Sequence, residues 1–379
     1  MAPYFEALHI LGPAILATWR MPSFLINHLH LLRSRSVVLQ DDDRIVSAGP
    51  LPVLLFSHGY TGVRNQNLLL CESLASHGYL VFSVEHSHDS TLSLFPDGRM
   101  ARFKAAPLPD ISVLDLWLLR SAQLGVRVDD MSFFLRALTR DVSLLPPDVS
   151  AVLTGRVDAS RVGIFGHSFG GATAIATSLA NSSAVHAVLG LDAWMWPLPA
   201  SLTGYSPFYL RKESHRDGDA ESGKEAFVSS RIKQSLAAPL MLLMAPKFFS
   251  ETAEFARFNR RMSSVLCEQT KKSRHSASCL TLYGTRHQDF CDMSLFAGLL
   301  TRFLGITGPR DAWGVHAAML EFSLHFFTNS LRVVSAAGVA AQDTHQHLAR
   351  YAGLLEDVFP AHVREEWAAG LDDFGEWVQ

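Results

Sequence analysis

The sequence predicts an α/β fold, with a mostly parallel sheet, helices on both of its faces and a helical extension at the C-terminal end. Short apolar runs alternate with helical segments along the chain, one strand–helix–strand unit is complete within about 35 residues, and an apolar strand runs directly into a Gly-x-Ser-x-Gly motif. Because the 379 residues are 48% hydrophobic and 18% charged, we expect a large buried core. We expect one domain with additions.

Residues 1–50 form an apolar N-terminal segment. Glu6 and Arg20 interrupt it, so its longest uncharged run is roughly 13 residues, shorter than the ~20 that a transmembrane helix needs. Glu6 also replaces the positive charge expected at the start of a secretory signal, which makes secretion the less favoured interpretation. Two interpretations stay open: a helix docked on the core, or a segment lying on a membrane surface.

The first strand–helix–strand unit follows this segment. Residues 51–57 predict a buried strand, residues 58–62 a loop, residues 65–77 a helix and residues 79–84 a second strand. Such a unit implies parallel strands with the helix across one face. A long helix is expected over residues 111–138, since apolar positions recur there at helical spacing.

The Gly-x-Ser-x-Gly motif nominates Ser168 as a nucleophile. Residues 162–165 predict the strand before it, and residues 170–180 predict a helix rich in small side chains after it. In this strand–turn–helix arrangement the serine sits on a strained turn, and Gly166 and Gly170 allow close packing of the flanking elements. The motif and its context therefore predict an α/β-hydrolase fold.

Three more strands are expected after the serine, at residues 185–191, 239–245 and 278–283. The hydrolase core is thus expected over residues 51–310. Within it, residues 201–233 form a charged, glycine-containing insertion that cannot build a core and is expected to be exposed. Residues 311–379 are helical in pattern and are expected to pack on the core.

A serine hydroxyl needs a base to take its proton, and the base needs a carboxylate to orient it. Asp192 directly follows the strand at residues 185–191, where catalytic groups gather in parallel sheets. His287 follows the strand at residues 278–283, so the chain order Ser168, Asp192, His287 is that of α/β-hydrolases. Competing groups are less favoured: Asp289 and Asp292 as loop or helix-cap carboxylates, and His58, His86, His88 and His167 as alternative bases.

The oxyanion hole of such a site consists of two backbone N–H groups. One comes from the residue after the nucleophile and the other from the loop after an earlier strand. Those residues are Phe169 and Tyr60.

Charge and composition exclude other classes of partner. The net charge of −3 gives no basic field for a phosphate backbone, so no nucleic acid is expected. No metal-binding motif is apparent, and neither a metal nor another cofactor is expected. The four cysteines have no paired spacing, which fits a reducing, cytoplasmic location, with peripheral membrane attachment as the open alternative.

Several short blocks together resemble one family. They are Phe56-Ser-His-Gly59, Ala75-Ser-His-Gly78, Val84-Glu-His86, Gly166-His-Ser-Phe-Gly-Gly-Ala-Thr173, Leu191-Asp-Ala-Trp-Met195 and His287-Gln288 with Phe290 and Asp292. The chain is similar, over about Pro52 to Phe303, to the serine-dependent platelet-activating factor acetylhydrolases, the calcium-independent phospholipases A2 of the α/β-hydrolase fold. The resemblance implies that Ser168, Asp192 and His287 are the triad and that the amides of Tyr60 and Phe169 form the oxyanion hole.

The resemblance also implies a substrate, namely the sn-2 acetyl or short or oxidised acyl ester of a glycerophospholipid, met at a membrane or micelle surface. A short-acyl enzyme must block its acyl pocket, because each further buried CH₂ favours binding by about 0.8 kcal/mol. Trp194 and Trp196 are candidates for that wall, or else plain core aromatics. The alternatives are a general short-chain carboxylesterase, a catalytically silent lipid-binding relative and an acyl-peptide peptidase. The sequence leaves the oligomeric state open.

Overall fold

The structure is a computed structural model of the 379-residue chain, and it describes residues 49–87, 89–95, 97–103, 112–198, 236–246, 253–296 and 298–332. The predictions for the apolar segment before residue 49, for the insertion at residues 201–233 and for the helices after residue 332 fall outside these ranges.

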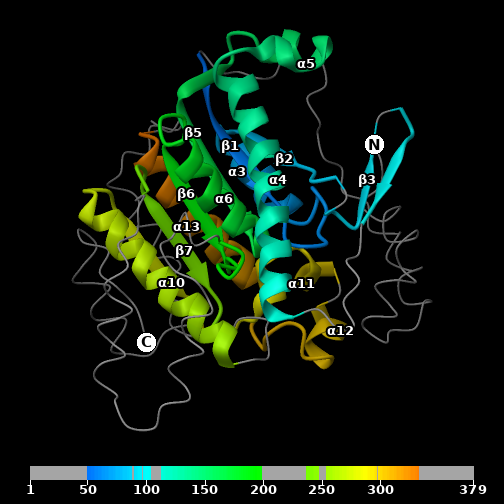
Figure 1. Ribbon diagram of the computed structural model, residues 1–379, viewed down its shortest axis with the longest axis vertical. Coiled ribbons are helices and arrows are strands. Elements are labelled where there is room, and N and C mark those ends of the chain that lie inside the picture. Colours follow the sequence, from blue (N-terminus) through cyan, green and yellow to red (C-terminus); the bar gives the residue numbers. More distant parts are fainter. Residues whose placement is uncertain are drawn as a thin grey trace.

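A six-stranded sheet forms the centre of the molecule (Figure 1), with the strand order β2-β1-β5-β6-β7-β8. Every neighbouring pair is parallel. The strands are β1 Leu51–Ser57, β2 Leu80–Val84, β5 Val157–His167, β6 Ala187–Leu191, β7 Leu240–Met244 and β8 Ala277–Thr281. The parallel, helix-covered sheet confirms the predicted α/β-hydrolase fold class.

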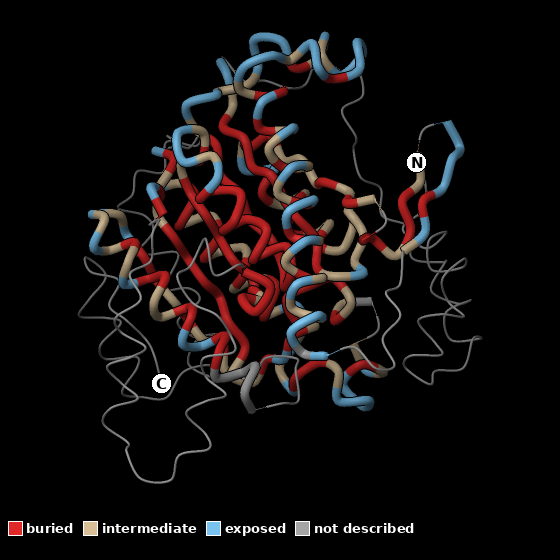
Figure 2. Tube along the Cα trace, in the orientation of Figure 1, coloured by how far each residue is buried: buried red, intermediate tan, exposed pale blue. Residues whose placement is uncertain are grey.

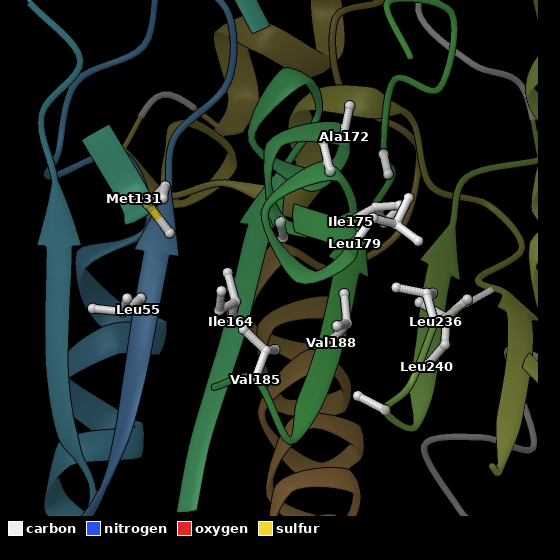
Figure 3. Close-up of a cluster of buried hydrophobic side chains, with 14 of the residues drawn as sticks. Leu55, Met131, Ile164, Ala172, Ile175, Leu179, Val185, Val188, Leu236 and Leu240 are labelled. Carbon is white, nitrogen blue, oxygen red and sulfur yellow. The ribbon is translucent and has the colours of Figure 1, made fainter. Parts of the chain in front are cut away.

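Alternate residues of the strands face two separate cores. On one face, Leu55, Ile164 and Val188 pack against α4 (Val113–Thr139), α6 (Phe169–Ala180) and α10 (Ala253–Lys272), as Figure 3 shows for α4 and α6. On the other face, Leu54, Phe56, Phe165 and Leu189 pack against α3 (Leu68–Ser76) and α13 (Ala312–Ser330). The sheet is therefore buried on both sides, and the buried tube segments of Figure 2 concentrate there.

Of the helices expected over residues 311–379, the described residues contain α13. Asp311 caps it by accepting a hydrogen bond from the Gly314 amide at 2.7 Å. Met319, Phe322, Phe326 and Phe327 bury its apolar side against the sheet. None of the helices within the described ranges is both long enough and apolar enough to span a bilayer.

The structure differs from the sequence-based expectation at three places. The helix expected from residue 65 begins at Leu68, and β5 begins at Val157 rather than Val162, with a bulge in its pairing between Pro52 and Val53 of β1. A small antiparallel hairpin, β3 (Leu92–Leu94) with β4 (Met100–Arg102), was not predicted. The remaining short elements are η2 (Val142–Leu144), α5 (Pro147–Leu153), η3 (His287–Phe290), α11 (Met293–Phe296) and α12 (Gly298–Phe303).

None of the four cysteines forms a disulfide. Cys71, Cys267 and Cys291 are buried, and Cys279 is half-buried. Burial raises the pKa of Cys71 well above its usual value and the pKa of both Cys279 and Cys291 to about 12. These thiols are therefore protonated at neutral pH.

Asp292 is a buried carboxyl that caps α3 from a distant part of the chain, since its Oδ2 accepts the Leu69 amide at 3.0 Å. Burial raises its pKa from 3.8 to about 7, and the charge of Glu72 adds to the rise. The nearby ring of His316 offers no compensating charge at neutral pH, because burial lowers its pKa to about 4.

We predict that Asp292→Asn becomes more stable relative to the wild type as the pH rises from about 4 to about 7. The folded wild-type protein holds a proton on Asp292 that the unfolded chain releases in this window, so its free energy of unfolding falls by about 1.4 kcal/mol per pH unit from this group. The asparagine removes that slope while keeping an oxygen for the α3 cap. Urea denaturation at several pH values measures the difference in free energy of unfolding between the two proteins. Parallel curves of this free energy against pH would contradict the prediction.

Candidate active site

Ser168 lies on the turn between β5 and α6, at φ 58° and ψ −119°, in the left-handed region of φ. The turn is tight because α6 passes very close to β1 at Gly170. A Cβ on Gly170 would lie 1.8 Å from the carbonyl oxygen of Ser57, and a Cβ on Gly166 would lie 2.2 Å from the carbonyl oxygen of Gly170. The Ser168 amide donates to the Leu191 carbonyl at 2.9 Å. These contacts hold the predicted strand–turn–helix geometry in place.

Asp192 lies at the carboxyl end of β6, where the parallel sheet directs it toward Ser168. Its side chain is fully buried, its Oδ1 accepts the Ala245 amide at 3.0 Å, and its Oδ2 accepts the Nδ1–H of His287 at 2.5 Å. The backbone amide at residue 245 therefore fixes one carboxylate oxygen and leaves the other for the histidine.

His287 begins η3, in the loop that follows β8. Its Nε2 lies 2.9 Å from the Oγ of Ser168. Because Nδ1 donates to Asp192, Nε2 is the acceptor, and the Ser168 hydroxyl donates to it. Ser168, His287 and Asp192 thus form one hydrogen-bonded chain, in which the ring can take the serine proton as a base.

The competing carboxylates lie elsewhere. Asp289 accepts the amides of Arg286 at 2.7 Å and Gly308 at 2.6 Å, so it orders the loop, and Asp292 caps α3. Neither is a partner of the His287 ring within the described residues. The structure brings Asp192 to His287 in their place.

The other histidines considered as bases also have different partners. His167 donates from Nε2 to the carbonyl of His287 at 3.0 Å, and the centres of the two rings lie 4.6 Å apart with their planes tilted by 33°. Burial lowers its pKa well below the usual value, with the charge of His287 as a further cause. His58 contacts Ser90 at 2.9 Å and Glu85 at 3.2 Å. His88 lies outside the described residues.

The two amides expected to form an oxyanion hole flank Ser168. Phe169 is the first residue of α6, and Tyr60 lies in the loop after β1. That loop rests against the serine, since a Cβ on Gly59 would lie 3.3 Å from the Ser168 Cβ. Neither amide donates a hydrogen bond to another atom of the described part of the chain. Both are thus available to a bound oxygen.

Aromatic rings surround the two amides. The Tyr60 ring lies 6.0 Å from Phe169, 6.4 Å from Trp194 and 5.4 Å from Phe103. Trp194 stacks on Trp196 at 5.8 Å. Trp194 is half-buried beside the turn that carries Ser168, whereas Trp196 is 2% exposed and belongs to the core. Of the two predicted wall residues, only Trp194 lies against the predicted oxyanion residues.

Three features of the site were missed from sequence. Arg127 and Arg120 of α4 are buried, and their guanidinium groups lie over the rings of Phe169 at 4.5 Å and Tyr60 at 4.1 Å. Gln66 accepts the Gly59 amide at 2.8 Å. A sequence pattern in α4 could have indicated the two arginines, because Arg120 and Arg127 lie on the same helical stripe as the apolar residues Leu124, Met131 and Leu135.

A second serine–histidine–aspartate chain was also unexpected. The Oγ of Ser57 lies 2.9 Å from Nε2 of His86, whose Nδ1 lies 2.8 Å from Asp130. Burial lowers the pKa of His86 well below its usual value and raises that of Asp130 to about 6. Ser57 is fully buried at the end of β1, so this chain supports the loop beside Ser168 rather than offering a hydroxyl to a substrate.

Within the described residues, no group of three or more histidine, cysteine, aspartate or glutamate side chains is placed to hold a metal ion.

Comparisons with known proteins place this geometry in context. The family model described as "Platelet-activating factor acetylhydrolase, isoform II" matches residues 13–208. A protein named platelet-activating factor acetylhydrolase from Gallus gallus is 25% identical over 300 residues, covering 72% of this chain and 62% of its own length. One of the same name from Bos taurus is 31% identical over 186 residues, covering 43% of this chain and 40% of its own length. The chain thus spans only part of the length of these relatives.

Among solved structures, a ferulic acid esterase from Streptomyces cinnamoneus matches with a TM-score of 0.49 and 23% identity, over 77% of this chain and 73% of that one.

Proposed function

The chain belongs to the platelet-activating factor acetylhydrolase isoform II family, and from this premise we propose that it hydrolyses the sn-2 acetyl or short or oxidised acyl ester of glycerophospholipids. One observation carries the proposal: the hydrogen-bonded chain from Ser168 through His287 to Asp192, set beside two amides that have no partner in the described part of the protein. The reaction proceeds through an acyl-enzyme on Ser168.

In the first half of the reaction, the Ser168 Oγ attacks the ester carbonyl as its proton passes to Nε2 of His287. Asp192 stabilises the imidazolium and keeps Nδ1 protonated. The carbonyl oxygen, which gains the negative charge, accepts hydrogen bonds from the amides of Tyr60 and Phe169. When the tetrahedral intermediate collapses, the imidazolium gives its proton to the departing lysophospholipid oxygen.

In the second half, water replaces the alcohol. His287 takes a proton from the water, which attacks the acyl carbon, and the same two amides bind the developing oxyanion. Collapse releases acetate or a short fatty acid and returns the proton to Ser168. Each step uses side chains and amides of this chain, so we propose activity in the presence of a calcium chelator.

Exposed apolar side chains support a substrate met at a lipid surface. Leu299 and Phe303 of α12 are 87% and 86% exposed, and Trp313 at the start of α13 is 64% exposed. Exposed apolar groups of this kind are typical of surfaces that contact lipid or another protein. α12 follows η3, the element that carries His287.

The test is acyl release from 2-acetyl and 2-palmitoyl glycerophosphocholine, measured side by side in chelator, with Ser168→Ala as the blank. Acetate release that is lost in Ser168→Ala, with little release of palmitate, supports the proposal. Cleavage of a soluble acetyl ester without cleavage of either lipid would instead favour a general carboxylesterase. A wild-type protein that neither cleaves esters nor reacts with a fluorophosphonate would contradict any serine hydrolase function.

We predict that Trp194→Ala widens the range of acyl chains accepted. The half-buried indole packs beside Tyr60 and Phe169, so its removal opens apolar space next to Ser168. Each added CH₂ that enters such space gains about 0.8 kcal/mol, or roughly fourfold in kcat/KM. The measurement is the hexanoyl-to-acetyl ratio of kcat/KM with p-nitrophenyl esters, with Trp313→Ala as the control. An unchanged ratio would exclude Trp194 from the acyl pocket.

A further inference from the structure

Arg127 is a buried arginine of α4 that no step of the proposed reaction uses. We propose that it is a positioning residue, which holds the His58-Gly59-Tyr60 loop so that the Tyr60 N–H points at the oxyanion. This inference rests on the proposed acyl transfer at Ser168. Arg127 is fully buried, so it acts through the loop and not by contact with a substrate.

The guanidinium binds two successive carbonyl groups of the loop. Its Nη1 donates to the carbonyl of His58 at 2.5 Å, and its Nη2 donates to the carbonyl of Gly59 at 3.1 Å. In a planar trans peptide, the carbonyl of Gly59 and the N–H of Tyr60 point in opposite directions. Holding the Gly59 oxygen toward Arg127 therefore turns the Tyr60 N–H away from α4.

The same side chain also contacts the other donor of the oxyanion hole. The guanidinium carbon lies 4.5 Å from the centre of the Phe169 ring, within the range of a cation–π contact. Arg127 thus touches both residues whose amides are proposed to bind the oxyanion. A rigid, planar group with donors in fixed directions suits this task better than a flexible ammonium.

Asp89 compensates the buried charge by accepting a hydrogen bond from the Nε of Arg127. Taking a charged pair out of water is costly, and an apolar pair of the same size is often at least as stable. Stability alone therefore gives little reason for an arginine at this position. An arginine is explained instead by its ability to hold two backbone carbonyls in a fixed direction.

A second set of contacts holds the opposite side of the loop. The Gly59 amide donates to Oε1 of Gln66, whose Nε2 donates to Nδ1 of His167 at 3.3 Å. His167 then donates from Nε2 to the carbonyl of His287 at 3.0 Å. The Gly59 carbonyl also accepts the Gly62 amide at 3.0 Å and the Nδ1–H of His58 at 2.8 Å, both from within the loop. Arg127 adds the restraint that ties the following peptide to α4.

The test compares the steady-state kinetics of Arg127→Met with those of the wild type, using p-nitrophenyl acetate and the acetylated phospholipid. Loss of one oxyanion donor lowers kcat by about 10²- to 10³-fold in other enzymes. We expect a kcat loss of about 10²-fold with KM within about threefold. Arg127→Lys, which can reach one carbonyl but not both, is expected to recover part of kcat, and it serves as the second variant if the methionine variant does not fold.

Two matched variants separate positioning from stability. Arg136→Met removes the same charge from the same helix, but Arg136 is exposed and contacts the Phe133 ring rather than a loop carbonyl, so kcat is expected to stay within about threefold. Asp89→Asn removes the charge that pairs with Arg127 and leaves both carbonyl contacts. We expect it to lower the urea midpoint as Arg127→Met does, yet to lose less than about tenfold in kcat.

The outcomes distinguish this inference from the proposed function. A wild-type protein that cleaves no ester overturns the function, and the inference with it. A wild-type protein that is active, with a folded Arg127→Met variant whose kcat is within threefold, overturns the inference alone. Equal kcat losses in Asp89→Asn and Arg127→Met at equal urea midpoints would also overturn it, because the arginine would then act only through stability.

Discussion

Asp192→Asn is expected to lower kcat for ester hydrolysis by about 10⁴-fold without unfolding the protein. The Ala245 amide is already bound to Oδ1, so the asparagine oxygen will take that position and its NH₂ group will face His287. The ring must then accept at Nδ1 and carry its proton on Nε2. In this tautomer Nε2 donates to Ser168 and cannot take the serine proton.

Asp289→Asn is the matched control, because Asp289 lies two residues from His287 but binds the amides of Arg286 and Gly308 instead. Its kcat is expected to stay within about tenfold of wild type. Both variants are measured with the acetylated lipid, and circular dichroism checks the fold. An Asp192→Asn variant with more than a tenth of wild-type kcat would remove Asp192 from the proposed triad.

Gly170→Ala is expected to prevent the protein from folding. The added Cβ would lie 1.8 Å from the carbonyl oxygen of Ser57 and 2.7 Å from that of His58, and both are backbone atoms held by β1 and the loop after it. To relieve the clash, α6 would have to move away from the sheet. A cost of more than about 4 kcal/mol is a large part of the ~5–15 kcal/mol that stabilises a typical domain.

Gly125→Ala adds the same methyl group at a position where we expect it to stabilise the protein. Gly125 is an exposed residue inside α4, and a Cβ there meets nothing within 4 Å. We expect it to stabilise the protein by about 0.5–1 kcal/mol, because alanine favours helix more than glycine does. Thermal melts of the two variants give the comparison. A soluble, folded Gly170→Ala protein of near wild-type stability would contradict the close approach described here.

The strands and the chain order of the site could be predicted because their signals are local. Ala187–Leu191 and Leu240–Met244 are fully buried runs, and fully buried runs are characteristic of central parallel strands. β5 was predicted too short because Asp158 and Ser160 are polar and the pairing bulges there. The three-residue strands of the β3–β4 hairpin are too short for an alternating pattern to be recognised.

The supporting residues could not be predicted, because their partners are far apart in the chain. Arg127 binds the carbonyl of His58, which lies 69 residues away, and His86 binds Asp130 over 44 residues. A charged side chain on an apolar helix stripe indicates that some buried partner exists, but it does not identify a backbone carbonyl as that partner. Trp194 and Trp196 illustrate the same limit. The two tryptophans are only two residues apart in the sequence, yet Trp194 lies half-buried beside Phe169 and Trp196 lies in the core.

Three buried cysteines and the half-buried Cys279 can report on local opening of the fold. Alkylating reagents react with the thiolate, and the high pKa of Cys279 and Cys291 keeps that form scarce while the fold is closed. In the unfolded chain the same thiols would return to a pKa of about 8.5 and would be modified at mildly alkaline pH. The rate of modification at each cysteine, followed by mass spectrometry, would therefore show which face of the sheet opens first.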